Sequence, residues 1–320
     1  MKVLVTDYTF GELIVETAVL APLGVTPIGA QCKTPADLLE LVRDADYVIT
    51  QFAPINREVI EAMQQSRIIV RYGIGVDNVD LEAAQERGIP VCNVPDYCID
   101  EVADHTLAFI LAATRQVVAN CNGVRAGRWK LATELSRMQT LRDLTVGIVG
   151  LGRIGKEVVA RLRPFKCRLL VHDPLVTGPA VESLGATAVS LDELYAQSDV
   201  ITLHCPSTAD TRALVSAATL QKMKRGVILV NLARGNLIVS GDLCAALASG
   251  QVGAAALDVF DPEPIPNDNP ILKMENVIVA PHIASTSVRA VRTLRETAAQ
   301  LVARRIRGES LMNVVNGVNV

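Results

Sequence analysis

Short apolar runs rich in β-branched residues alternate with amphipathic stretches along the first hundred residues. The runs lie at 3–5, 47–50, 68–70 and 90–92, and the helical patterns between them at 35–44, 57–64 and 80–87. Apolar runs without polar alternation are typical of strands buried on both faces, and intervening helices allow successive strands to lie parallel. The pattern predicts a small α/β unit.

The alternation resumes after residue 144 on a larger scale. Six apolar runs, at 145–149, 168–172, 200–204, 227–231, 253–257 and 277–280, are separated mostly by helical patterns or turns. Six parallel strands connected in this way are what a complete dinucleotide-binding sheet requires. A single long helix is expected before them at 99–120, followed by an irregular segment around 127–130.

The last helical pattern, at 286–307, is followed by no new strand and can return to the first unit. We therefore expect an α/β protein in which a Rossmann-type doubly wound parallel sheet, at 100–285, is inserted into a smaller flavodoxin-like α/β domain. The smaller, discontinuous domain comprises 1–99 and 286–320 and is expected to bind substrate.

A glycine-rich turn follows the strand at 145–149 and opens the next helix. Its glycines are Gly150, Gly152 and Gly155, in the pattern G-x-G-x-x-G. Such glycines allow the tight turn, the close approach of a pyrophosphate and the packing of helix on strand. The pyrophosphate would lie at the helix N-terminus, where Arg153 and Ile154 offer backbone N–H groups.

Asp173 ends the next predicted strand, where a carboxylate accepts hydrogen bonds from the adenosine ribose hydroxyls. A carboxylate there repels a 2′-phosphate, so NAD is favoured over NADP. The structural alternative is a glycine-rich turn beside a surface Asp.

The search for an acid or base is short because the chain has four histidines. Among them, His282 lies at the carboxyl end of the last predicted strand, the edge where doubly wound sheets bind ligands. Hydride transfer to a ketone needs a proton donor and the reverse reaction a base, and imidazole serves both. Glu263 can orient that imidazole, and Arg234 supplies a planar cation for a carboxylate. Taken singly, each has a structural reading: a loop cap, a solvated turn residue or a partner of a structural acid.

Together these motifs resemble the D-isomer-specific 2-hydroxyacid dehydrogenase family over almost the whole chain, and are most similar to its phosphoglycerate-dehydrogenase-like and C-terminal-binding-protein-like members. The matching segments are 72–77, 101–104, 150–155, 231–235, 255–260 with 263–264, and 281–284. The resemblance implies an NAD-dependent oxidoreductase in which Arg234 binds and polarises substrate, Glu263 pairs with His282, and His282 transfers the proton.

The resemblance also implies further binding residues. Cofactor contacts beyond the glycine turn and Asp173 are expected from Thr106, His204, Cys205, Pro206, Thr211, Leu232, Ala233, Asp258, His282 and Ala284. Backbone N–H groups around Tyr72, Gly73 and Ile74 would hold the substrate carboxylate, as a nest holds an anion. Arg71 is a candidate for a second anionic group on the substrate, and its alternative is an ion pair with a surface acid.

Two other functions stay open at this stage. One is a corepressor-like binding protein that senses NADH with little or no turnover, although Ser285–Ser287 replaces the aromatic residue that such proteins place after the histidine motif. The other is a dehydrogenase for formate or phosphite, which would use the same Arg, Glu and His in a smaller pocket.

Composition and charge restrict the classes of partner that the chain is expected to bind. A net charge of −3 and the absence of a Lys/Arg-rich run argue against nucleic acid. No apolar run is long enough for a bilayer, residues 1–7 lack a signal-peptide pattern, and seven cysteines without zinc-ligand spacing predict reduced thiols and no metal site. We expect a cytoplasmic enzyme acting on a small molecule, and the resemblance implies a homodimer formed through 99–130.

Overall fold

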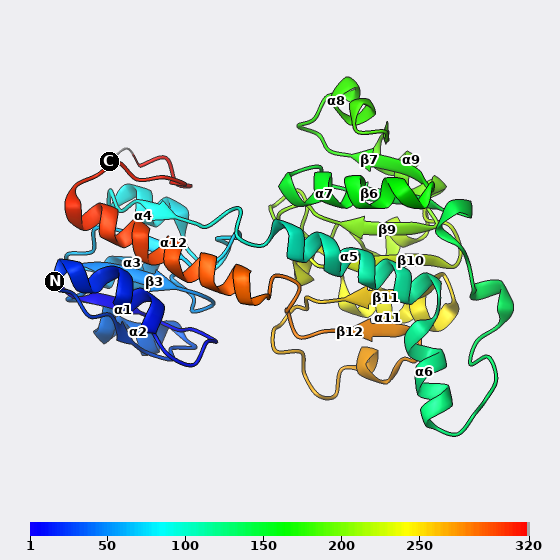
Figure 1. Cartoon of the computed structure of the whole chain (residues 1–320), viewed down its shortest axis with the longest axis horizontal. Coiled ribbons are helices and arrows are strands. Elements are labelled where there is room, and N and C mark those ends of the chain that lie inside the picture. The colour runs from blue at the N-terminus through cyan, green and yellow to red at the C-terminus, as the bar shows by residue number, and fades with distance from the viewer. Residues whose placement is uncertain (319–320) are drawn as a thin grey trace. The chain divides into compact units, whose positions relative to one another are not determined.

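The computed structural model describes residues 1–318, which form two compact units. The small unit comprises Met1–Tyr97 with the C-terminal segment that begins at Ser287, and the large unit comprises Cys98–Thr286. Both are built around parallel sheets with helices on each face, so the predicted α/β class is confirmed (Figure 1).

The sheet of the small unit has the order β2-β1-β3-β4-β5, which is the flavodoxin-like order 2-1-3-4-5. Its strands are β1 Val3–Val5, β2 Ile28–Gly29, β3 Tyr47–Thr50, β4 Ile69–Arg71 and β5 Val91–Cys92. Sequence analysis missed β2 because it is two residues long and exposed, and therefore carries no apolar run.

Alternate strand residues of this sheet enter two different cores. Val5 and Ile49 pack against α1 and α12, whereas Leu4 and Val48 face the opposite layer of α2, α3 and α4. Both faces are thus covered, which explains the unbroken apolar runs of these strands. The helices are α1 Ile14–Leu20, the short 3-10 turn η1 Ala21–Leu23, α2 Pro35–Val42, α3 Arg57–Ala62, α4 Leu81–Glu86 and α12 Val288–Arg307.

The large unit contains a seven-stranded sheet within the described residues. Its order is β12-β11-β10-β9-β6-β7-β8, the Rossmann order with one further strand at the β12 edge. The strands are β6 Thr145–Val149, β7 Arg168–His172, β8 Thr187–Ala188, β9 Val200–Leu203, β10 Val227–Asn231, β11 Val252–Leu257 and β12 Val277–Val279. β8 was missed for the same reason as β2, since it is short and exposed.

Helices cover both faces of the large sheet. They are α5 Ile99–Thr114, α6 Val117–Arg125, α7 Arg153–Leu162, α8 Gly178–Ser183, α9 Leu191–Gln197, α10 Ala217–Leu220 and α11 Ser240–Ser249. Short 3-10 turns lie at η2 Leu135–Arg137, η3 Leu141–Asp143, η4 Arg163–Phe165, η5 Gly235–Leu237 and η6 Pro270–Lys273. Among residues 1–318, no helix combines the length and the apolar character needed to cross a membrane.

The prediction of one helix at 99–120 is wrong. Gln116 adopts a left-handed conformation with φ of 51°, which ends α5 at Thr114 and starts a second helix, α6, at Val117. The side-chain periodicity continues across the break, so the apolar pattern alone does not reveal it. α5 packs along α7, and Arg161 of α7 binds Asp100 and Asp104 of α5 at 2.6 and 2.7 Å (Figure 1).

Candidate active site

Two glycines of the turn after β6 lie too close to neighbouring backbone to carry a side chain, and the third faces open space. A Cβ on Gly150, whose φ is +95°, would lie 2.7 Å from the backbone N of Cys205, and one on Gly155 would lie 2.2 Å from the carbonyl oxygen of Gly150. Neither position can therefore accept a side chain without movement of backbone. At Gly152 a Cβ would meet nothing within 4 Å, so a ligand can approach the N-terminus of α7 there.

Asp173 lies just beyond β7 and ties the end of that strand to the glycine turn. Its Oδ2 accepts from the N–H of Leu151 at 2.7 Å, and its Oδ1 accepts from the N–H of Leu175 at 2.8 Å. Carboxylate oxygens have further lone pairs, so both can still accept hydrogen bonds from ribose hydroxyls. The carboxylate is thus fixed beside the turn before any nucleotide binds.

The loop after β9 brings His204, Cys205 and Pro206 next to the same turn. The N–H of His204 donates to the carbonyl of Val149 at 2.7 Å, and burial lowers the pKa of its imidazole to about 4, so the ring is neutral near pH 7. Burial also raises the pKa of the Cys205 thiol to about 11. Thr211 closes this loop because its hydroxyl donates to the carbonyl of Pro206 at 2.6 Å.

Thr106 is placed differently from these loop residues. It is fully buried within α5, and its hydroxyl donates to the carbonyl of Val102 at 2.7 Å. Its hydroxyl hydrogen is therefore used inside its own helix, and only its lone pairs are left for another donor.

Arg234 is held at the end of β10 by a buried amide. Asn231, only 1% exposed, donates from Nδ2 to the carbonyl of Arg234 at 2.8 Å and accepts at Oδ1 from the N–H of Ala233 at 3.0 Å. On the other side, a Cβ on Gly235 would lie 2.0 Å from the carbonyl carbon of Phe260. Sequence reasoning missed the positioning role of Asn231, although its place at a strand end was a usable signal.

Leu232 and Ala284 are buried hydrophobic residues, and Ala233 is half-buried against the core beside β10. Their side chains carry no polar group. Any contribution they make to a ligand site comes from their apolar surface or from the backbone.

Asp258 follows β11 and organises the loop that carries His282. Its carboxylate is completely buried, and its two oxygens accept from the N–H groups of Ile283 and Ala284, each at 2.8 Å. Its own carbonyl accepts from the N–H of His282 at 2.8 Å. Both carboxylate oxygens thus serve the fold of this loop, a role that sequence reasoning did not assign.

His282 and Glu263 form a direct pair. The Nδ1 atom of His282 lies 2.7 Å from Oε2 of Glu263, while Oε1 of Glu263 accepts from the N–H of Phe260 at 2.8 Å. Burial by itself raises the pKa of Glu263, but the hydrogen bond from His282, the N–H of Phe260 and the charge of Arg234 bring it below its ordinary value of 4.5. Because an ionised carboxylate only accepts, Nδ1 carries the hydrogen and Nε2 is the atom that can exchange a proton.

In the small unit, only some backbone N–H groups of the segment after β4 have a hydrogen-bond acceptor in the protein. The N–H of Tyr72 donates to the carbonyl of Thr50 at 2.7 Å, and that of Gly73 donates to the carbonyl of Arg71 at 2.9 Å. Two of the three predicted anion-binding amides are therefore already used. Within the part of the chain that the structure describes, the amides of Ile74 and Gly75 donate to no protein acceptor.

Arg71 lies over this segment and is 9% exposed. A Cβ on Gly73 would fall 1.4 Å from Nη1 of Arg71, so the guanidinium occupies the space that a side chain at position 73 would need. The same guanidinium lies 5.8 Å from the ring centroid of Phe52. It is thus packed against Gly73, the residue that precedes the amides of Ile74 and Gly75. Among residues 1–318, no three His, Cys, Asp or Glu side chains gather as a metal site would need.

Comparison with known proteins decides the family. Residues 107–284 match the model of the D-isomer specific 2-hydroxyacid dehydrogenase NAD-binding domain. The chain belongs to the D-isomer specific 2-hydroxyacid dehydrogenase family. The family predicted from the motifs is confirmed, and the large unit carries the family's NAD-binding domain.

Individual members of this dehydrogenase family are similar over most of the chain. The D-3-phosphoglycerate dehydrogenase of Methanocaldococcus jannaschii is 37% identical over 100% of the chain, which spans only 60% of that relative. The glyoxylate reductase of Korarchaeum cryptofilum is 39% identical, with 87% of this chain and 85% of the relative covered. A crystal structure of D-lactate dehydrogenase from Aquifex aeolicus, complexed with NAD and lactic acid, superposes with a TM-score of 0.87 at 26% identity, covering 96% of each chain.

The lowered pKa of Glu263 predicts a pH-dependent contribution to stability. The folded state favours the ionised carboxylate, so this contribution is present above pH 4.5 and is lost as the pH falls through the folded pKa. We expect Glu263→Gln to lower the free energy of unfolding near neutral pH by about 1 kcal/mol or less, because both side chains are partly exposed. Urea denaturation should show this difference shrinking as the pH falls below 4.5 and through the folded pKa. A difference that widens on acidification would contradict the assignment.

Proposed function

We propose that this chain transfers hydride between NAD(H) and a small D-2-hydroxy or 2-oxo acid. The observation that carries the proposal is the pair formed by His282 Nδ1 and Glu263 Oε2 at 2.7 Å. It lies at the carboxyl edge of the large sheet, where Arg234 and the glycine turn also follow their strands. An oriented imidazole at the same sheet edge as a nucleotide-binding turn is the arrangement that hydride transfer to a ketone requires.

The residues of the large unit fit a dinucleotide. The open space at Gly152 and the N-terminus of α7 suit a pyrophosphate, and Asp173 suits the adenosine ribose. Further contacts are proposed from Arg153, Ile154, the turns at His204–Pro206 and Leu232–Ala233, and Thr106, Thr211, Asp258 and Ala284. Bound NAD(H) supplies or accepts the hydride, and the protein orients it.

The proton is handled by His282. In the reductive direction Nε2 donates a proton to the carbonyl oxygen of the substrate as the second carbon receives hydride, and in the oxidative direction Nε2 removes it. Glu263 holds the ring through Nδ1 and balances the imidazolium charge. Arg234 is proposed to bind the substrate carboxylate and polarise the carbonyl.

In the small unit, the amides of Ile74 and Gly75 are proposed to receive the substrate carboxylate. They have no protein acceptor among the described residues, and the positively charged Arg71 lies against the preceding residue, Gly73. We further propose that Arg71 binds a second anionic group where the substrate has one. The relative named D-3-phosphoglycerate dehydrogenase is consistent with such a group, whereas that named glyoxylate reductase takes a smaller acid by its name.

A screen of 2-oxo acids tests the proposal. NADH oxidation is followed with glyoxylate, pyruvate, hydroxypyruvate, phenylpyruvate, 2-oxoglutarate and phosphohydroxypyruvate, in the wild-type protein and in His282→Asn. We expect turnover with at least one acid, and a fall in kcat of roughly 10² to 10⁴ in the variant, the usual contribution of a general acid. The dissociation constant of NADH should stay within about twofold, because the residue acts on the proton.

The outcomes separate the alternatives. An equal loss of NADH binding in His282→Asn would count against its role as proton donor. Tight NADH binding without turnover of any acid, together with association that depends on the nucleotide, would instead support a corepressor-like protein. Oxidation of formate or phosphite with NAD, without turnover of the acids, would identify the smaller-pocket dehydrogenase.

Asp173 is expected to set the preference for NAD. Replacement by Ala removes the carboxylate that repels a 2′-phosphate, so Asp173→Ala should reduce the ratio of kcat/KM for NADH to that for NADPH by about tenfold or more. The loss of the bond to Leu151 should weaken both cofactors alike. An unchanged ratio would remove Asp173 from this role.

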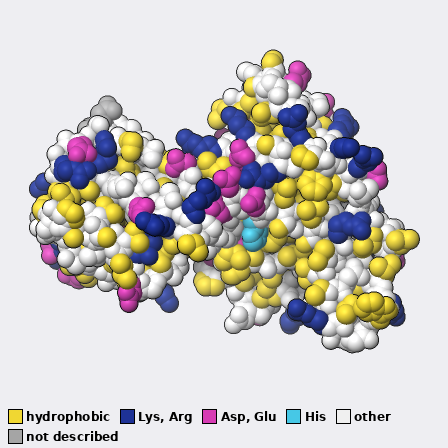
Figure 2. All heavy atoms as spheres, in the orientation of Figure 1, with side chains coloured by type: hydrophobic (Ala, Val, Ile, Leu, Met, Phe, Trp, Pro, Cys, Tyr) yellow, Lys and Arg dark blue, Asp and Glu magenta, His cyan; other side chains and the backbone are white. Residues whose placement is uncertain are grey.

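We also propose a homodimer formed through 99–130. Trp129 is 90% exposed, Leu131 52% and Val117 53%, and hydrophobic side chains gather near α6 and the segment that follows it (Figure 2). An exposed apolar patch of this kind is typical of a protein interface. Analytical ultracentrifugation should give twice the chain mass, and Trp129→Glu should shift the equilibrium towards monomer; a monomeric wild-type protein at micromolar concentration would refute the dimer.

A further inference from the structure

A buried ionic cluster in the small unit joins three elements that are distant in sequence. Glu16 of α1 is completely buried, and its carboxylate accepts from Nε and Nη2 of Arg295 of α12 at 2.8 and 2.7 Å. The phenol of Tyr72, just after β4, donates to the same carboxylate at 2.9 Å. Arg295 also donates to the carbonyl of Glu12 and lies 4.5 Å from the ring centroid of Phe10.

The cluster has the features of a fixed anchor. The Glu16 carboxylate accepts from a guanidinium and a phenol, and the Arg295 side chain is 11% exposed. The Tyr72 ring is 1% exposed and meets Phe10 edge to face at a centroid distance of 5.3 Å. Burial, followed by the charge of Glu16, raises the pKa of Tyr72, so its phenol stays protonated as the donor. A buried charge with satisfied partners permits few alternative arrangements.

Tyr72 connects this ionic cluster to the backbone of the segment that follows β4. The next residue, Gly73, has a φ of +146° and carries the Arg71 guanidinium above it, while its carbonyl accepts from the N–H of Val94 at 3.0 Å. The carbonyl of Ile74 accepts from Nδ2 of Asn93 at 2.6 Å. The peptide that leads to the free amides of Ile74 and Gly75 is therefore preceded by the anchored Tyr72 side chain, and its carbonyls are held by Val94 and Asn93.

We propose that Glu16 and Arg295 are positioning residues. Arg295 holds Glu16, Glu16 holds the phenol of Tyr72, and these contacts fix the direction in which the backbone N–H groups of Ile74 and Gly75 point. The inference rests on the proposed function, because it assigns those amides to the substrate carboxylate. Glu16 and Arg295 touch no substrate, and they act on substrate affinity through the backbone of 72–75. Carboxylate binding is the same in the ground state and the transition state, so its loss should appear in KM.

The decisive variant is Tyr72→Phe, which removes one hydroxyl and leaves Glu16 bound to Arg295. We expect the KM for the best 2-oxo acid to rise about fivefold or more, kcat to change by less than about twofold, and the KM for NADH to stay constant. Glu16→Gln is the conservative partner, because its amide oxygen can still accept from the phenol. It should retain a KM closer to the wild-type value than Tyr72→Phe does.

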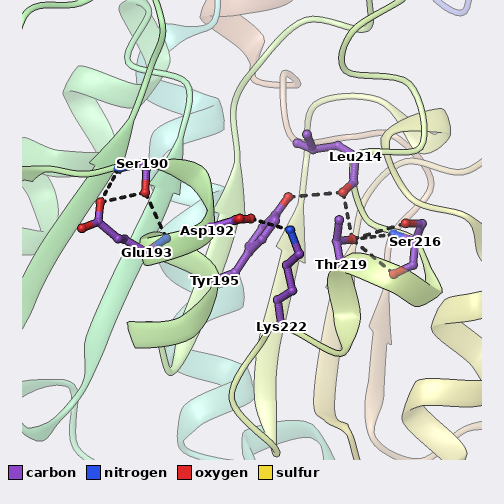
Figure 3. A network of polar contacts seen from close by, with 8 residues as sticks. All are labelled: Ser190, Asp192, Glu193, Tyr195, Leu214, Ser216, Thr219 and Lys222. Carbon is purple, nitrogen blue, oxygen red and sulfur yellow. Dashed lines mark hydrogen bonds and ion pairs between the residues drawn. The ribbon is translucent and has the colours of Figure 1, made fainter.

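The large unit offers a matched control. Tyr195 is also fully buried, and its hydroxyl donates to the carbonyl of Leu214 at 3.2 Å, beside the polar contacts of Thr219 and Ser216 (Figure 3). Tyr195→Phe removes a comparable hydrogen bond away from the 72–75 segment. It should lower thermal stability without changing the KM for the acid. A rise in this KM equal to that of Tyr72→Phe would show a general loss of stability and overturn the proposal.

Hydrogen exchange gives a readout that needs no turnover. In Tyr72→Phe the hydrogen-bonded amides of Tyr72, Gly73 and Val94 should exchange faster, while those of β3 in the same unit keep their rates. Equal acceleration throughout the small unit, or no change at these three amides, would refute the anchor. If the wild-type protein reduces no 2-oxo acid, the proposed function fails, whereas exchange at these three amides still decides whether the anchor exists.

Discussion

The carboxylate of Asp258 is the constraint on which the loop of His282 in the large unit depends. His282 has a φ of 54°, a left-handed conformation that costs a non-glycine residue about 1 kcal/mol or more. Two charge-assisted hydrogen bonds from the amides of Ile283 and Ala284 offset that cost, since each contributes about 1.5–3 kcal/mol. The imidazole is thereby presented to Glu263 by a backbone that these hydrogen bonds fix, and the proton transfer proposed for His282 would start from a preorganised ring.

Polar side chains at the ends of other strands, in both units, also fix neighbouring loops by hydrogen bonds. Asn231, the last residue of β10, fixes the backbone around Arg234, and Asp173 after β7 fixes the glycine turn. In the small unit, Asp7 after β1 accepts from the N–H groups of Gln51 and Phe52 beyond β3, at 2.9 and 2.6 Å. Parallel strands end together at one edge, where loops have few partners of their own. Short polar side chains at these positions supply the missing acceptors, so the loops that carry function are ordered by the sheet.

Sequence reasoning succeeded where the physical signal is local. Strands buried on both faces give apolar runs, and the glycine turn shows its steric demands in its spacing, so the α/β class and most elements could be predicted. The left-handed Gln116, which splits the helix expected at 99–120, breaks no apolar pattern. The amides of Tyr72 and Gly73 donate to the carbonyls of Thr50 and Arg71, and the sequence pattern does not reveal these acceptors. The contact between Glu16 and Arg295 joins residues 279 positions apart, which no periodicity encodes.

In the small unit, the proposed carboxylate site consists of backbone amides, whereas the Tyr72 side chain serves to hold that backbone. A carboxylate beside a carbonyl is common to every 2-oxo acid, and backbone amides such as those of Ile74 and Gly75 can bind it whatever the neighbouring side chains are. The anchoring side chain, Tyr72, points into the helix layer towards Glu16, away from that task. The proposed function therefore assigns recognition of the shared carboxylate to the backbone, which is consistent with relatives named for different acids, D-3-phosphoglycerate dehydrogenase and glyoxylate reductase.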